Sequence, residues 1–146
     1  MANQIKSIEP TRSFWIIGVV ALLWNAIGIV SYWMTVTVSP QALQAMTAPE
    51  RALYQGIPIW VTSAYAIAVF GGTLASIALL LRRAWAVPVF VLSLVAILVQ
   101  MRHAFFMTTM LEVHGLGGAV LPMLVIVVAI YLVAFSRSAR KKGWIR

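Results

Sequence analysis

The side chains best suited to chemistry lie near the end of one long apolar stretch, residues 87–110. Gln100, Arg102 and His103 follow a mainly hydrocarbon run there. An apolar run of about 20 residues is typical of a membrane-spanning helix, in which ionisable groups need a partner, a water-filled cavity or the membrane surface. Gln100 and His103 share one helix face, and Arg102 lies about 100° away. Counted from Ala84, about 20 residues reach His103, so this count places Arg102 and His103 at the interface.

Arg102 is the side chain in this stretch that most needs a partner. The chain has 3 acidic residues, and Glu9 lies at the opposite end of the spans. A partly buried arginine needs a carboxylate or a set of carbonyl groups. We therefore expect Arg102 to form an ion pair with Glu50 or Glu112. The alternative is that Arg102 extends to lipid phosphates at the membrane surface.

No sequence motif predicts catalysis. The chain has no cysteine, which excludes disulfides, thiolate metal sites and cysteine nucleophiles. His103 and His114 could ligate haem or a metal, but their spacing is not diagnostic of such a site. The apolar stretches contain no Asp or Glu, which argues against a proton-coupled exporter. The sequence therefore favours a protein without catalytic residues, cofactor or metal.

The composition predicts an integral membrane protein. Of the 146 residues, 62% are hydrophobic and 10% are charged, a balance that soluble domains do not have. Apolar stretches predict spans over residues 14–35, 59–81, 87–110 and 118–135. We expect one all-α transmembrane domain, a four-helix bundle whose last span is peripheral because it is almost entirely aliphatic.

The longest predicted loop, residues 36–57, carries two helix-start signals. Ser39 followed by Pro40 is typical of a capped helix start, and Thr47 with Glu50 forms a capping-box pattern. We predict short helices over residues 40–46 and 48–54.

Charge predicts the topology. The net charge is +8, and the basic residues flank the spans rather than forming a nucleic-acid surface. Most of them fall on the side of the two termini, so the positive-inside rule places both termini in the cytoplasm. We expect a multi-pass protein of a bacterial inner membrane, with no nucleic-acid partner. The basic tail with Trp144 predicts an anchor at the membrane surface.

Small residues form two packing faces. Gly18, Asn25, Gly28 and Tyr32 recur at helical spacing on the first span. The second span carries a matching ridge, which comprises Ala68, Gly72 and Ser76. Small residues let helix backbones approach closely, and an asparagine can hydrogen-bond across such a seam. The alternative is that Asn25 and Tyr32 line a ligand cavity.

The polar side chains within the spans gather in the half away from the termini. Any pocket would therefore open outward. Its candidate lining residues are Asn25, Tyr32, Tyr65, Gln100, Arg102 and His103.

Several short segments carry a resemblance to a known family. They are Trp24-Asn25-x-x-Gly28, Tyr32-x-Met34-Thr35, Arg51-x-x-Tyr54, Pro58-x-Trp60, Gly71-Gly72 and Trp85-Ala86-Val87-Pro88. Together they resemble a family of small bacterial four-span proteins that are often called hypothetical or labelled sugar transporters. Family members carry an Asp before the tyrosine at the end of the first span, where this chain has Ser31. The resemblance implies a four-span fold and a transport hypothesis, and it assigns no functional residue.

Two functions follow from these patterns, and a third, weaker possibility is an enzyme. The first is an accessory or structural membrane protein that binds a partner or lipid without catalysis, alone, as a homo-oligomer or in a larger membrane complex. The second is a small-solute carrier or binding protein with an outward-facing polar pocket. A carrier needs a polar path through the half of the bundle near the termini, and the sequence places almost no polar groups there.

Overall fold

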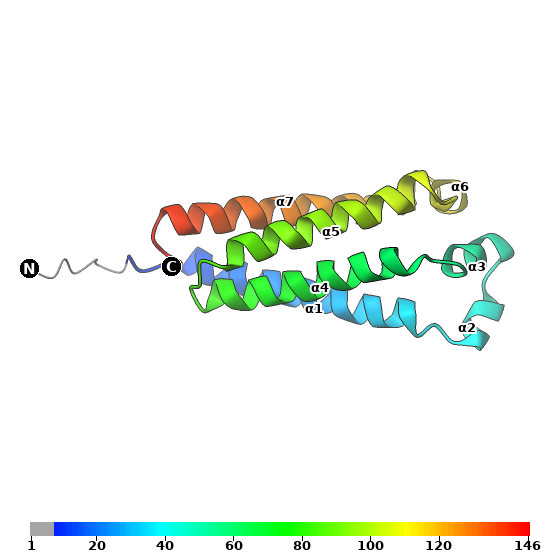
Figure 1. Ribbon diagram of the computed structural model, residues 1–146, viewed down its shortest axis with the longest axis horizontal. Coiled ribbons are helices and arrows are strands. Elements are labelled where there is room, and N and C mark those ends of the chain that lie inside the picture. The colour runs from blue at the N-terminus through cyan, green and yellow to red at the C-terminus, as the bar shows by residue number, and fades with distance from the viewer. Residues whose placement is uncertain (1–7) are drawn as a thin grey trace, which may run out of the picture.

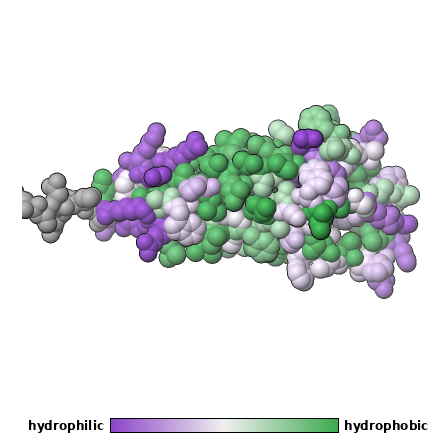
Figure 2. Space-filling view, viewed as in Figure 1, coloured by the Kyte–Doolittle hydropathy of each residue, from purple (hydrophilic) through white to green (hydrophobic). Residues whose placement is uncertain are grey.

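The computed structural model describes residues 8–146, which form seven α-helices, one 3₁₀ turn and no β-strand. Four helices are long and apolar enough to cross a membrane, as predicted. They are α1 (Arg12–Val36), α4 (Ile59–Leu80), α5 (Ala86–Phe106) and α7 (Val120–Lys141), and they run side by side along the long axis in Figure 1. Figure 2 shows an apolar band around the middle of the molecule, with hydrophilic residues gathered toward both ends.

Two predicted spans end several residues away from the expected position. The third span was predicted to reach residue 110, but α5 ends at Phe106 because Thr108 interrupts the helix. Its hydroxyl donates to the Ala104 carbonyl at 2.7 Å and accepts from the Met110 backbone N–H. The fourth span was predicted to end at residue 135, but α7 continues to Lys141. Arginine and lysine are good helix formers, and they are favoured near a helix C-terminus.

The loop regions are mostly helical. The predicted short helices are present as α2 (Pro40–Ala45) and α3 (Ala48–Tyr54). The stretch between α5 and α7 contains α6 (Met110–His114) and a 3₁₀ turn (Leu116–Ala119). Figure 1 shows α2, α3 and α6 together at the end of the bundle away from the two termini. We call this the loop end, residues 32–62 and 100–120.

The helices are arranged in the order α1, α4, α5, α7. The central helix α4 packs against α1 and α5, and α7 packs on α5. Small residues allow the α1–α4 contact: a Cβ at Gly18 would lie 2.5 Å from Leu80, and one at Gly28 would lie 3.1 Å from Val69. A Cβ at Gly72 would collide with the Asn25 side chain.

The seam between α1 and α4 contains one polar contact. Asn25 Nδ2 donates to the Ala21 carbonyl at 2.8 Å and to Ser76 Oγ at 3.4 Å. Ser76 is fully buried, and its hydroxyl donates to the Gly72 carbonyl. Because the Asn25 amide N–H groups and the Ser76 hydroxyl have partners, this contact adds specificity to the seam.

The opposite end of the bundle, residues 8–17, 79–87 and 132–146, is closed by aromatic packing. We call it the terminal end. Phe14 is fully buried, with its ring centroid 6.1 Å from that of Phe135 and 5.9 Å from that of Trp144. Trp144 was predicted to anchor at the membrane surface. The chain turns back after α7 and places the Trp144 ring against Phe14, with Ile145 only 2% exposed, and the anchoring role of Trp144 stays a prediction.

Hydrogen bonds hold the C-terminal segment over the α4–α5 turn. Arg82 Nε donates to the Trp144 carbonyl at 2.8 Å, and the Arg146 backbone N–H donates to the Arg82 carbonyl at 2.9 Å. Ala84 N–H donates to the Arg146 carbonyl in return. Arg82 has a φ of 58°, a left-handed conformation that is uncommon for a residue with a side chain and that these bonds help to hold. The terminal end is thus tied together by residues from three parts of the chain.

Candidate ligand-binding site

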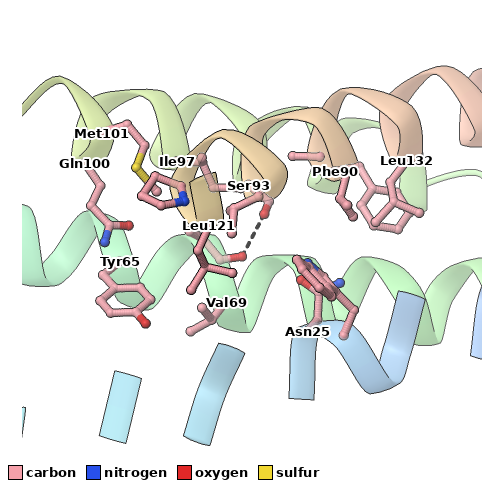
Figure 3. A pocket seen from close by; sticks show the side chains of 17 residues that line it. Asn25, Tyr65, Val69, Phe90, Ser93, Ile97, Gln100, Met101, Leu121 and Leu132 are labelled. Carbon is pink, nitrogen blue, oxygen red and sulfur yellow. Dashed lines mark hydrogen bonds between the residues drawn. The ribbon is translucent and has the colours of Figure 1, made fainter. Parts of the chain in front are cut away.

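A cavity of about 190 Å³ lies inside the bundle, between all four long helices. We call it the inner cavity, and Figure 3 shows its lining side chains. Most of the lining is aliphatic or aromatic, including Phe90 and Ile97 from α5 and Leu121 and Val125 from α7. A cavity of about 150 Å³ with such a lining stays dry and binds small apolar molecules. The inner cavity is therefore large enough for a segment of hydrocarbon chain.

Four polar side chains line the inner cavity, and two of them are bound to the protein. Asn25 makes the seam contact with α4, and Ser93 Oγ donates to the Ala68 carbonyl at 2.7 Å, the bond drawn in Figure 3. Tyr65 and Gln100 form no side-chain hydrogen bond within residues 8–146. Tyr65, Gln100 and the side-chain oxygen of Asn25, which accepts no hydrogen bond within residues 8–146, are therefore available to a ligand.

A second cavity of about 280 Å³ lies at the loop end, and we call it the outer cavity. Tyr65 and Gln100 line both cavities, so they mark the boundary between them. The outer cavity is more polar than the inner one. Its lining includes Thr35, Thr62, Tyr65, Gln100, His103, Thr108 and His114.

His103 is oriented by an aromatic contact. Its ring stands edge-on to Trp60 at a centroid distance of 5.4 Å. His103 and His114 both line the outer cavity, but residues 8–146 contain no group of three or more His, Asp or Glu side chains that could hold a metal ion. The arrangement provides hydrogen-bonding groups around a cavity rather than a metal centre.

The structure does not bring Arg102 together with either acid. Glu50 closes the predicted capping box at α3, where its Oε2 accepts from the Thr47 hydroxyl at 2.7 Å and from the Thr47 backbone N–H at 2.9 Å. These two bonds, the hydroxyl first, hold the pKa of Glu50 below its ordinary value of 4.5. Arg102 and Glu112 are both exposed. The arginine that binds into the loop end is Arg51, whose guanidinium donates to carbonyls at the end of α2.

The remaining predicted lining residues divide between the cavities and the helix seams. Asn25 is part of the α1–α4 seam and also lines the inner cavity. Tyr32 lines neither cavity: its ring packs edge-on against Tyr65 at 5.3 Å and Phe70 at 5.9 Å. It therefore fixes the position of the Tyr65 ring rather than contacting the space itself. Ala68 and Gly72, predicted as packing residues, also line the inner cavity.

Sequence reasoning missed the wall that α7 contributes. The wall comprises Leu121, Pro122, Val125, Val128, Ala129 and Leu132. All are apolar, so they give no polar signal, and α7 was expected simply to face lipid. Their spacing of three and four residues does place them on one helix face, and that face could have been recognised.

The comparisons with known proteins add no relative. No family model, curated protein or solved structure matches the chain.

Proposed function

We propose that this chain is a multi-pass membrane protein that binds a lipid without catalysis, holding a hydrocarbon chain in the inner cavity. The observation that carries the proposal is a largely apolar cavity lined by all four long helices, in which the side chains of Asn25 and Ser93 already hydrogen-bond to the protein. Such a space favours hydrocarbon over water, because water needs several polar partners.

The test compares two substitutions on the same helix. Val125 lines the inner cavity, and Val127 is 58% exposed on the outer side of α7. Val125→Phe fills part of the cavity, so we expect it to reduce the lipid that stays bound through purification, measured by native mass spectrometry. Val127→Phe should retain the parental amount. Equal retention by both variants and the parent would contradict the proposal.

The alternative function, an outward-facing pocket for a small polar solute, is favoured by the lining of the outer cavity. Gln100 and His103 could hydrogen-bond such a solute. The closed terminal end argues against passage across the bundle, so we expect binding rather than transport. Under this alternative, His103→Ala would abolish binding of a monosaccharide such as glucose, measured by equilibrium dialysis, and lipid retention would be unchanged.

For localisation we propose a bacterial inner membrane, with both termini in the cytoplasm and the loop end outside. The distribution of basic residues supports this orientation. The chain has no native cysteine, so single cysteines can be labelled cleanly. In intact spheroplasts, Ser39→Cys should react with an impermeant maleimide added outside, and Ser138→Cys should not. The reverse pattern would overturn the orientation.

Association with further copies or in a larger membrane complex is compatible with the exposed apolar faces of the long helices.

A further inference from the structure

A groove of about 250 Å³ separates α1 and α7 on the side of the bundle, and every residue that lines it is apolar or aromatic. We call it the side groove. Ile16, Ile17, Val20 and Ala21 line it from α1, and Tyr131 lies on the α7 side. Trp24, Val128 and Leu132 line both the side groove and the inner cavity. These three side chains therefore lie between the groove and the inner cavity.

The groove lies between α1 and α7 because these two helices contact each other at the terminal end and otherwise pack on different helices. Phe14 stacks on Phe135 at the terminal end, whereas the main packing partners of the two helices are α4 and α5 respectively. The long helices lie within the apolar band of Figure 2, so this opening would face hydrocarbon rather than water. The packed side chains of the terminal end block access of a ligand to the inner cavity from that end of the bundle.

Charge at the terminal end indicates which lipid would be favoured. Arg12 lies one helical turn before Ile16 and therefore on the same face of α1 as the groove. The other basic residues of this end are Arg82, Arg83, Arg137, Arg140, Lys141, Lys142 and Arg146, and its acid is Glu9. Basic residues next to a membrane attract anionic headgroups.

From the side chains that the groove and the cavity share and from this charge, we infer that the ligand is an anionic phospholipid of the bilayer. Its headgroup lies at the terminal end near Arg12, and one acyl chain runs along the side groove, past Trp24 and into the inner cavity. The inference rests on the proposed lipid-binding function and adds to it the class of lipid and the route of access.

The experiment uses Trp24 as a reporter. The other five of the 6 tryptophans are replaced by phenylalanine, and the full chain is placed in phosphatidylcholine–phosphatidylglycerol vesicles. Bromine atoms in acyl chains quench tryptophan fluorescence on contact, so the brominated chain is placed either on phosphatidylglycerol or on phosphatidylcholine. Half-maximal quenching of Trp24 should need an about fivefold lower mole fraction of the brominated anionic lipid, the preference that one basic residue near an anionic surface provides. Circular dichroism checks that the variant keeps its helices.

Two pairs of variants make the test specific. Val20 lines the groove and not the inner cavity, and Val19 lines neither. Val20→Phe should therefore weaken quenching by brominated phosphatidylglycerol, and Val19→Phe should not. Arg12→Gln should remove most of the anionic preference while leaving quenching at saturating lipid unchanged.

Equal quenching by both lipids, or no effect of Val20→Phe, would overturn the inference. Failure of this inference is distinguishable from failure of the proposed function. If lipid retention depends on Val125 but Val20→Phe leaves the quenching of Trp24 unchanged, the cavity is loaded by another route and the function stands. If Val125→Phe leaves retention unchanged, the function itself fails.

Discussion

At the terminal end Phe14 is 0% and Ile145 2% exposed, whereas at the loop end Phe106 is 84% exposed. The same four helices make both ends, so helix type does not explain the difference. At the terminal end, residues from three separated parts of the chain pack and hydrogen-bond around Phe14 and Arg82. At the loop end the short helices are stabilised mostly by local contacts, and the outer cavity reaches between them to Tyr65 and Gln100. The terminal end is therefore closed by contacts between residues that are far apart in the sequence.

The largest effect expected from this difference is on stability. Phe14→Ala removes a fully buried ring that packs on three aromatic partners, so we expect it to lower the free energy of unfolding by about 3–5 kcal/mol. Phe106→Ala at the loop end should change it little. Thermal unfolding in detergent measures both. Similar losses for the two variants would mean that the loop end is packed as tightly as the terminal end.

The middle of the bundle gives the next largest effect. Gly72→Ala places a methyl group against Asn25 and Ser93, and overpacking of this kind costs about 1–3 kcal/mol. Its neighbour Gly71 is a matched control, since a methyl group there would make only an ordinary contact at 3.7 Å from Ser93. Unfolding in detergent should show a loss for Gly72→Ala alone. Equal behaviour of the two variants would place Gly72 away from the α1–α4 seam.

A smaller effect is expected from the C-terminal segment. Arg82→Gln removes the hydrogen bonds from the guanidinium to the carbonyls of Trp144 and Ile8, and one net hydrogen bond is worth about 1 kcal/mol. Amide hydrogen exchange should become faster at Trp144 and Arg146. The neighbouring Arg83 is exposed, and Arg83→Gln should leave exchange unchanged. Loss of protection in both variants would point to general charge loss rather than to these bonds.

The smallest effect is confined to α3 at the loop end. Hydrogen bonds from Thr47 lower the pKa of Glu50, so the ionised carboxylate stabilises the folded helix. This stabilisation is fully present above the ordinary carboxyl pKa and is lost as the pH falls through the lower folded value. The protection factors of the α3 amides, corrected for the intrinsic pH dependence of exchange, should therefore fall below about pH 4.5, the ordinary value for this group. Thr47→Val should abolish most of this pH dependence, and Glu112→Gln should preserve it.

The parts of the fold that were predicted correctly depend on local rules. Length and hydropathy locate the four spans, and the starts of α2 and α3 follow from Ser39 and from the Thr47–Glu50 pair. The end of α5 was missed because Thr108 is a single residue whose hydroxyl competes with the helix backbone. The site was predicted in part. Asn25, Tyr65, Gln100 and His103 line the cavities. Glu50 was expected to pair with Arg102, and its position in a loop does not reveal that its carboxylate accepts a hydrogen bond from Thr47.

The closed terminal end could not be predicted from spacing. Arg82 and Trp144 are separated by 62 residues, and no local pattern connects them. The α7 wall of the inner cavity is equally hidden, because aliphatic residues that face a cavity and those that face lipid look alike in sequence. Long-range packing decides both features.

The most direct test of the difference between the two ends is access of water-soluble reagents to buried positions. Gln100 lies at the boundary of the two cavities, and Ser136 is fully buried at the terminal end. In a chain with no native cysteine, Gln100→Cys should be labelled by an impermeant methanethiosulfonate reagent added on the loop side. Ser136→Cys should resist the reagent from either side of the membrane until the protein is unfolded. Rapid labelling of Ser136→Cys in the folded protein, or complete protection of Gln100→Cys, would contradict a bundle that is closed at its terminal end and open at its loop end.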